Sequence, residues 1–220
     1  SSLLRRVYQR YGVEVPGGGK DVPLYLTEYG YQTNPPDPIG VSPAKQAAYL
    51  NEAEFLTYRN KRVRTLSQFL YNDDLPDPAL SDPIAAFGGT FQSGLATSDG
   101  TPKKGAILAY RMPIFLPSRT VTRRHSMRVW GMVRPAINNT RTRVRIQARS
   151  RKGRYKTVRT VNTSRGRAYV DARIRPRSSG AVRLVWIDGD GTTVTSRSVS
   201  FRIKAAKKKG KKKSSRTGKR

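Results

Sequence analysis

The residue best placed to do chemistry is Glu28, which directly follows the short, mostly apolar run of residues 22–27. Two tyrosines, a glycine and the proline-rich segment 34–38 come after it. A carboxylate at the C-terminal end of a parallel strand lies where α/β enzymes gather their catalytic groups. Burial against aromatic side chains would shift its pKa, as nucleophilic or acid/base chemistry requires. The spacing alone fits equally well a Glu that caps a strand or pairs with an arginine, so both interpretations stay open.

Helical and strand patterns alternate in the first half of the chain. Near-continuous apolar runs are typical of strands buried on both faces of a parallel sheet. The Ser42-Pro43 pair predicts a helix start, because proline fits the first helical position. That helix should bury Ala47, Leu50, Phe55, Tyr58 and either Ala53 or Glu54. In chain order we expect a helix over 3–11, a strand over 22–27, a helix over 43–59, a strand over 63–71, an irregular stretch over 75–100 and a short helix over 103–110.

From about residue 118 the pattern changes to period two, with Arg alternating with apolar residues. Short strands at regular spacing, separated by turn residues, predict an antiparallel sandwich. The expected strands cover 127–133, 144–149, 155–161, 168–174, 182–187 and 194–203. The chain therefore divides into residues 1–117, 118–204 and 205–220. The last segment is rich in Lys, Ser and Gly, cannot bury a core, and is expected to be disordered.

The net charge of +30 is unevenly distributed. Residues 1–117 carry 12 Lys/Arg and 11 Asp/Glu, whereas residues 118–204 carry 23 and 3, and residues 205–220 carry 9 and none. Clustered Lys and Arg give salt-sensitive affinity for phosphate polymers. A basic surface also serves solubility, so that alternative stays open. Because the sequence has no helix-turn-helix, zinc-finger or stacking-platform motif, nucleic acid is expected only as a non-specific partner.

Several classes of site and location are excluded or disfavoured. The chain has no Cys, which excludes a disulfide framework and thiolate chemistry. No apolar run is long enough to span a bilayer. The chain begins without a charged-then-apolar leader, so any signal peptide is expected to be already removed or to lie upstream. His125 is the only His, and Asp73 and Asp74 are expected to face water, so we expect no metal or other cofactor.

Three ordered stretches resemble the C-terminal end of clan A glycoside hydrolases, the retaining (β/α)8 enzymes, and most closely their secreted, cellulase-like actinobacterial type. PLYLTEYGYQTNPP (23–36) is similar to the seventh barrel strand with the nucleophilic Glu at its tip. QAAYLNEAEFLTYRNKRVRTLSQFLYNDD (46–74) is similar to the seventh helix and the eighth strand. TFQSGLATSDGTPKKGAILAYRMPI (90–114) is similar to the closing loop and the final helix.

The resemblance implies that Glu28 is the nucleophile of a double-displacement hydrolysis. That reaction uses two carboxyl groups about 5–5.5 Å apart, one attacking the anomeric carbon and one protonating the leaving oxygen. The family's acid/base Glu follows the fourth strand, for which this chain has no matching position. Glu14 lies in a loop, and Glu52 and Glu54 lie in the middle of a helix, so none of them substitutes for it. The resemblance therefore implies a fragment that holds half of a catalytic pair.

The same resemblance suggests residues that bind the substrate. Tyr71 stands near the tip of the eighth strand, where the family usually has a Trp that forms the floor of the sugar subsite. An ordinary core aromatic is the alternative for Tyr71. Tyr31 and Asn72 are further candidates for hydrogen bonds to a sugar. Trp130 and Trp186 alternate with apolar residues inside strands and are expected in the core rather than on a carbohydrate platform.

The sequence thus predicts α/β plus all-β architecture. An incomplete C-terminal part of a (β/α)8 barrel, about its last two β/α units, is expected to precede an immunoglobulin-like β-sandwich and a disordered basic tail. The expected function is retaining O-glycosyl hydrolysis of a polysaccharide or oligosaccharide, with the chain inactive alone. The alternative is a non-catalytic basic module that binds an anionic cell-wall polymer or nucleic acid. Either function fits an extracellular or cell-wall-associated protein.

Overall fold

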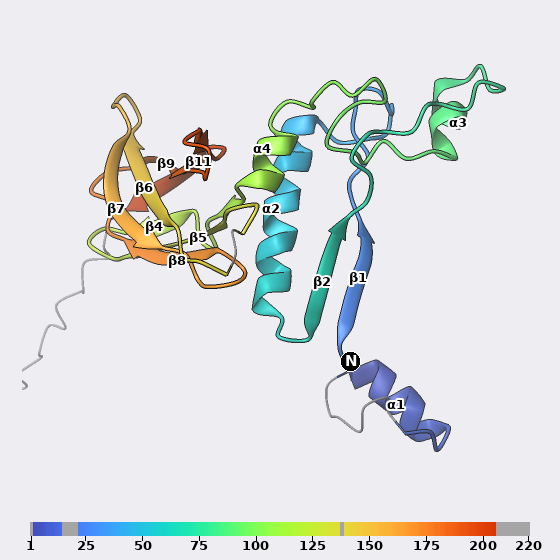
Figure 1. Ribbon diagram of the computed structural model, residues 1–220, viewed down its shortest axis with the longest axis horizontal. Coiled ribbons are helices and arrows are strands. Elements are labelled where there is room, and N and C mark those ends of the chain that lie inside the picture. Colours follow the sequence, from blue (N-terminus) through green and yellow to red (C-terminus); the bar gives the residue numbers. More distant parts are fainter. Residues whose placement is uncertain (1, 15–21, 137–138, 206–220) are drawn as a thin grey trace, which may run out of the picture.

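The computed structural model describes residues 2–14, 22–136 and 139–205 of the protein. In these residues the chain is a mixed α/β protein, with its helices before residue 112 and most of its strands after it. Figure 1 shows the helix α2 (Pro43–Arg59) standing between the strand-rich part and the parallel strands. No helix of the described residues is long and apolar enough to cross a membrane. The tail expected to be disordered lies, from residue 206 on, outside the described residues.

Two of the helices begin where the sequence places a capping side chain before a proline. The Ser42 side chain accepts a hydrogen bond from the Lys45 N–H at 3.4 Å, and α2 has the predicted bounds. The same signal starts α3 (Pro83–Gly88), where Asp82 accepts from the Ala85 N–H at 2.8 Å. The stretch expected to be irregular therefore contains a short helix that its Asp82-Pro83 pair could have predicted. The remaining helices are α1 (Ser2–Arg10) and α4 (Ala106–Arg111).

The buried face of α2 is more polar than its apolar pattern indicates. Ala47, Leu50 and Phe55 are buried as predicted, and of the pair left open it is Glu54 that is buried. The prediction is wrong for Tyr58, which is only half-buried. Asn51 is fully buried and satisfied on both sides of its amide. Its Nδ2 donates to the Ala109 oxygen at 2.8 Å, and its Oδ1 accepts from the Ile114 N–H at 3.2 Å. The Asn51 amide thus fixes α2 against α4 and against the strand that begins at Ile114.

The strands β1 (Leu24–Tyr29) and β2 (Val63–Gln68) form a two-stranded parallel sheet in the described residues. Leu24 pairs with Val63 and Tyr29 with Gln68, so both strands end at the same edge. The prediction that these strands are buried on both faces is wrong for the described residues: the four residues between Leu24 and Tyr29 are exposed. The reason is that two strands and one helix leave much of the sheet uncovered.

The strand-rich part consists of two sheets. One has the order β4-β11-β9-β6-β7, with β10 beside β9, and the other has the order β3-β5-β8. Both sheets contribute to one hydrophobic cluster that includes Val129, Val144, Trp186 and Phe201. The strands are β3 (Ile114–Phe115), β4 (Thr120–Thr122), β5 (Met127–Met132), β6 (Arg143–Ser150), β7 (Lys156–Asn162), β8 (Tyr169–Ile174), β9 (Gly180–Ile187), β10 (Thr193–Thr195) and β11 (Val199–Lys204).

The observed strands follow the period-two pattern closely, with three differences. One is β4, which the pattern did not predict and which pairs with β11 in parallel, so the prediction of a wholly antiparallel sandwich is wrong at this edge. The segment expected as one strand over 194–203 is divided into β10 and β11. The strand-rich part also starts before residue 118, because Ile114 pairs with Gly131 and is fully buried in the shared core. Gly131 is required at this contact, since a Cβ there would lie 2.4 Å from the Leu184 side chain and 2.6 Å from the Pro113 oxygen. Trp130 and Trp186 are buried, as the sequence predicts.

An ion pair joins α2 to the strand-rich part. Glu54 Oε1 lies 2.8 Å from the Arg134 guanidinium, while the other carboxylate oxygen is buried with no hydrogen-bond partner in the described residues. Burial raises the pKa of Glu54 to about 7, although Arg134 acts in the opposite direction. The desolvation of the carboxylate therefore outweighs its attraction to Arg134.

Because the pKa of Glu54 is raised, the free energy of unfolding should depend on pH, and Glu54→Gln should remove this contribution to the dependence. The folded protein holds this proton more tightly than the unfolded chain, so the stabilisation is complete below the ordinary pKa of 4.5 and is lost as the pH rises to about 7. The free energy of unfolding of the wild type, relative to the variant, should fall by about 3 kcal/mol across that window. Urea unfolding at each pH measures it. Glu52→Gln, on the exposed side of the same helix, should keep the wild-type profile, and an unchanged Glu54→Gln profile would contradict the assignment.

Candidate functional site

Glu28 is the next-to-last residue of β1, at the edge where both parallel strands end. This placement agrees with the position expected from the sequence. Its surroundings do not: Glu28 is exposed, and its carboxylate has no hydrogen bond or ion pair in the described residues. The expected burial of Glu28 against aromatic side chains is therefore corrected. With only two strands in the described sheet, nothing covers the carboxylate on its open side.

A hollow of about 280 Å³ lies beside Glu28. Its aromatic wall is the pair Phe69 and Phe91, whose rings meet edge to face at 5.1 Å. Glu28 is the only carboxylate among the lining residues, which are Glu28, Tyr29, Gly30, Gln32, Phe69, Phe91 and Ser93. The hollow can therefore offer one carboxylate, one side-chain amide and a hydroxyl beside an aromatic surface. It offers no second acid or base.

The residues expected beside Glu28 lie elsewhere. Tyr71 is on the same edge of the sheet but is 62% exposed and does not line the hollow. The strand ends at Gln68 rather than at Tyr71, and Leu70 has a positive φ of 66°, which turns the chain. Phe69 occupies the place beside Glu28 that was assigned to Tyr71.

The other two candidates also lie outside the hollow. Tyr31 packs edge-on against Tyr29, with ring centres 5.4 Å apart, and at a tilt against Tyr49, with ring centres 4.9 Å apart. Asn72 is exposed and forms a backbone bridge to Ala96. Sequence reasoning missed Phe91 and Ser93, although both stand in the stretch 90–114 that carried the resemblance.

A buried ion pair holds the loop that forms the far wall of the hollow. Lys103 Nζ lies 2.6 Å from Asp73 Oδ1 and donates to the Gln92 oxygen at 2.7 Å. The Gly94 N–H donates to the same Asp73 oxygen at 2.8 Å. The expectation that Asp73 faces water is wrong, because its side chain is only 1% exposed. Asp73 instead fixes the segment after β2 against residues 92–94.

Gln46 of α2 ties both sides of the hollow to the helix. Its fully buried Nε2 lies within 3.2 Å of the backbone oxygens of Tyr31, Ser93 and Gly94. Gly30 adds a close approach, since a Cβ at this position would lie 2.6 Å from the Ser93 Cβ. These contacts place the segment after β1 directly against the segment 92–94. The wall of the hollow is thus positioned by polar contacts that lie beneath it.

Metal chemistry finds no support in this part of the molecule. No group of three or more His, Cys, Asp or Glu side chains in the described ranges could hold a metal ion. His125 is exposed, and its Nδ1 lies 3.2 Å from the Arg123 oxygen.

The sequence matches no protein-family model and no curated relative. Among solved structures, the chain is similar in part to a superoxide reductase (neelaredoxin) from Ignicoccus hospitalis, with 13% identity and a TM-score of 0.36 over 42% of this chain and 80% of that chain. Murine CRIg is similar over 44% of this chain and 98% of its own, with 13% identity and a TM-score of 0.29. An alkylpurine DNA glycosylase from Pseudomonas fluorescens, bound to DNA with an abasic-site analogue, gives 10% identity and a TM-score of 0.28 over 46% of this chain and 33% of its own. These likenesses carry no functional argument.

Proposed function

We propose that the first part of the chain is the nucleophile-bearing portion of a retaining glycoside hydrolase, with Glu28 as the nucleophile. The observation that carries this proposal is the position of Glu28, at the C-terminal end of a parallel strand and beside an aromatic-lined hollow. In (β/α)8 enzymes the catalytic groups gather at that end of the strands. The resemblance of residues 23–36, 46–74 and 90–114 to such enzymes supports the same assignment.

In this proposal the sheet is completed by strands that the described residues do not supply. A retaining hydrolysis needs a second carboxyl about 5–5.5 Å from the first. Glu28 has no such neighbour in the hollow, so the acid/base group has to come with the added strands. Phe69 and Phe91 would then pack against the apolar face of a sugar ring, a contact that aromatic side chains make well. The substrate class is a polysaccharide or oligosaccharide.

The chain by itself is expected to hydrolyse no glycoside. The purified chain should be inactive on aryl glycosides and on β-glucan, xylan and mannan, because one carboxylate cannot serve both steps of the reaction. Mixing it with a barrel fragment that supplies the missing strands and an acid/base Glu should give turnover. The same mixture made with Glu28→Ala stays inactive if the proposal holds. Glu28-dependent turnover by the chain alone would contradict the expectation of inactivity.

We further propose that the strand-rich part is an accessory immunoglobulin-like sandwich that keeps the hydrolase close to an anionic cell wall. Its excess of Arg and Lys supports this role, as does the arrangement of two sheets over one shared core. An extracellular or cell-wall-associated location follows from the same proposal.

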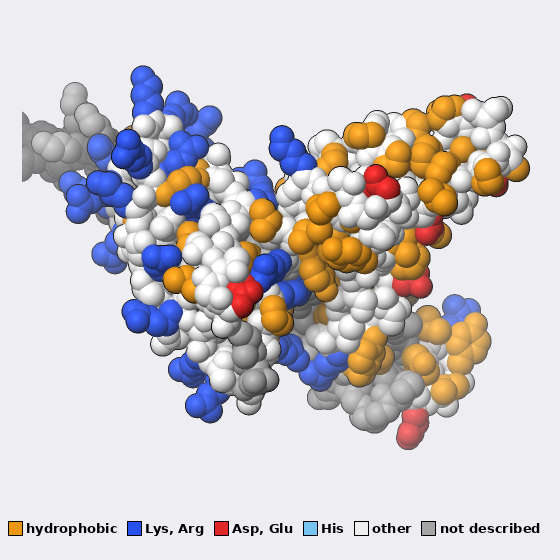
Figure 2. Space-filling model, turned by 45° about the horizontal axis from the view of Figure 1, so that its top comes forward, with side chains coloured by type: hydrophobic (Ala, Val, Ile, Leu, Met, Phe, Trp, Pro, Cys, Tyr) orange, Lys and Arg blue, Asp and Glu red, His pale blue; other side chains and the backbone are white. Residues whose placement is uncertain are grey.

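A second candidate function, in which the basic part is itself a polyanion-binding module, rests on one groove. The groove has a volume of about 500 Å³ and is lined by Arg119, Arg149, Arg151 and Arg202 together with uncharged residues of β4, β9 and β11. No acidic side chain lines it. Figure 2 shows Lys and Arg side chains spread over this end of the molecule, with few acidic ones among them. A chain of phosphate or sulfate groups would find closely spaced cations here.

Salt dependence tests this second candidate. Binding to heparin, teichoic acid and duplex DNA should weaken steeply as salt is raised, because bound counterions are released. Arg202→Ala should lower the slope of log K against log salt by about 1, the value of one lost phosphate contact. Arg10→Ala removes the same charge from an exposed position outside the groove and should leave the slope unchanged. Binding that is insensitive to salt would rule the groove out.

A further inference from the structure

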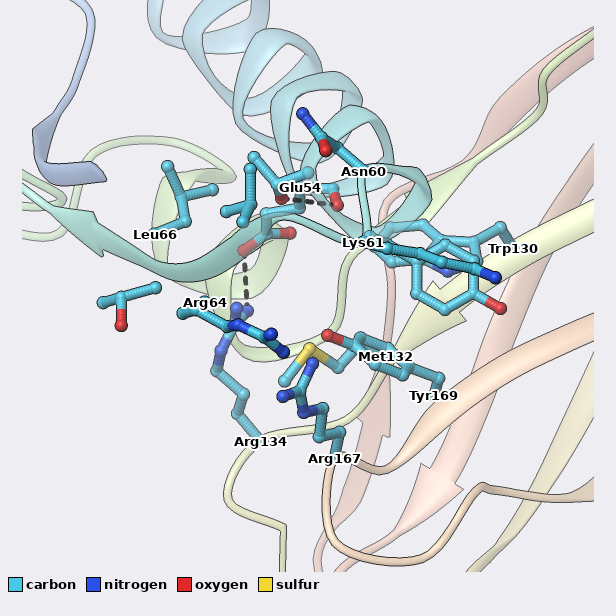
Figure 3. Close-up of a pocket in the computed structure, with 14 residues that line it drawn as sticks. Glu54, Asn60, Lys61, Arg64, Leu66, Trp130, Met132, Arg134, Arg167 and Tyr169 are labelled. Atoms are coloured by element: carbon cyan, nitrogen blue, oxygen red, sulfur yellow. Dashed lines mark hydrogen bonds and ion pairs between the residues drawn. The ribbon is translucent and has the colours of Figure 1, made fainter. Parts of the chain in front are cut away.

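A third hollow, of about 450 Å³, lies between β2, the end of α2 and the strand-rich part (Figure 3). It is lined from one side by residues 54–66 and from the other by Trp130, Met132, Arg134, Arg167 and Tyr169. Its lining extends from Lys61, just before β2, to Leu66, and it shares no residue with the hollow beside Glu28. The hollow is therefore separate from the candidate hydrolase site, and a role for it is independent of the proposed function.

The charges around this hollow are unbalanced. Four cationic side chains line it against the single carboxylate of Glu54. Only Arg134 forms an ion pair among them, at 2.8 Å from Glu54, while Lys61, Arg64 and Arg167 have no ion-pair partner in the described parts of the chain. Figure 3 shows the Arg64 and Arg167 side chains reaching the same side of the hollow beside Met132. Convergent like charges repel, so an anion placed between them would be stabilising.

An aromatic cluster forms the other wall. The ring of Tyr58 lies 5.4 Å from that of Trp130 and 4.7 Å from that of Tyr169, measured between ring centres. Trp130 is fully buried, yet its indole N–H has no hydrogen-bond partner in the described residues. A buried donor without a partner costs free energy. Because Trp130 is part of the wall, its indole signal can report on a ligand that binds in the hollow.

We propose that this hollow is a binding site for a phosphate monoester of a monosaccharide-sized or nucleoside-sized ring. A phosphate group carries a charge of about −1.5 to −2 at neutral pH and accepts paired hydrogen bonds from guanidinium groups. The three cations without an ion-pair partner carry more charge than the single carboxylate of a sugar acid could balance. This favours a phosphate group as the ligand's anion. The aromatic wall supplies a surface for the ring. The volume falls in the range of small-ligand sites, about 300–1,000 Å³.

Two tryptophans allow a direct test by NMR. In a ¹H–¹⁵N spectrum of the full chain, the indole signals of Trp130 and Trp186 are two separate reporters. Trp186 Nε1 donates to Thr142 Oγ1 at 2.9 Å, away from the hollow, and so reports on the fold. Titration with glucose 6-phosphate, and separately with AMP, should move the Trp130 signal in a saturable way and leave Trp186 in place. Glucose should move neither signal, and inorganic phosphate should bind at least tenfold more weakly than the better ester.

Matched arginine variants separate a built site from general attraction to a basic protein. Arg64→Ala and Arg167→Ala should each weaken binding of the ester about tenfold or more. Arg145→Ala, which removes the same charge from an exposed position outside the hollow, should not change it. The unshifted Trp186 signal shows that each variant is folded. An unmoved Trp130 signal with both esters, an equal loss in Arg145→Ala, or inorganic phosphate binding as tightly as the esters would each overturn the proposal.

Discussion

Under the proposed function, Glu28→Gln should lower turnover at least about 10³-fold in a complex whose barrel is completed by added strands. The amide keeps the size and hydrogen-bonding reach of the carboxylate but cannot attack the anomeric carbon, so no glycosyl-enzyme intermediate forms. Stopped assays on an aryl glycoside measure the rate. Because the side chain is exposed and makes no hydrogen bond or ion pair in the described residues, the stability of the variant should equal that of the wild type.

The control for this prediction is a second Glu-to-Gln change in the same part of the chain. Glu52 is exposed on α2 and does not line the hollow beside Glu28. Glu52→Gln should therefore retain the wild-type rate. Trapping with a 2-fluoro glycoside adds a readout besides rate, since the label should appear on the peptide that contains Glu28. A fully active Glu28→Gln enzyme, or a label on another peptide, would end the assignment.

Lys103→Met should cost about 3–5 kcal/mol of the free energy of unfolding, the range expected when one partner of a buried ion pair is removed. Lys103 and Asp73 are 2% and 1% exposed in their side chains, and burial lowers the pKa of Lys103 and raises that of Asp73. Burial thus acts against both charges, and each is tolerated only because the other is there. Removing Lys103 leaves a buried carboxylate whose Oδ2 already lacks a partner in the described residues.

Urea unfolding followed by fluorescence measures this loss, and the chain supplies a matched control. Lys104 is the next residue and is exposed, so Lys104→Met should change stability by less than about 0.5 kcal/mol. Lys103→Met combined with Asp73→Asn should recover part of the loss, because it removes both buried charges. Equal effects of the two lysine changes would mean that the ion pair does not support the loop.

The sequence predicted elements that depend on local signals. The bounds of α2 follow from Ser42, Pro43 and the helical spacing of Leu50 and Phe55, all of which act within a few residues. The strands of the second part follow from period-two alternation, which also placed Trp130 and Trp186 in the core. The position of Glu28 at the end of a parallel strand was likewise readable, since an apolar run and a turn segment surround it.

What the sequence did not predict depends on contacts between distant residues. The burial of Asp73 depends on Lys103, thirty residues later, and no local pattern reveals that pairing. Phe69 lies beside Glu28 in place of Tyr71 because the strand ends at Gln68, before a turn at Leu70. No glycine in the sequence marks that turn. The exposure of β1 depends on how many strands lie beside it, which alternation within one strand does not encode.

The hydrogen bonds of Asn51 determine which piece of this protein can be transplanted. Its Oδ1 also accepts from Arg197 Nε at 2.6 Å, so one amide connects residues 146 positions apart in the sequence. Burial lowers the pKa of Arg197 to about 10. Its guanidinium also donates to the Ile114 oxygen at 3.2 Å. An engineer who grafts the strands onto another protein should therefore take α2 and α4 with them. Cutting after α4 would remove Asn51 and leave the half-buried Arg197 guanidinium with the Ile114 oxygen as its remaining acceptor of the two. The segment to transplant therefore includes helices as well as strands.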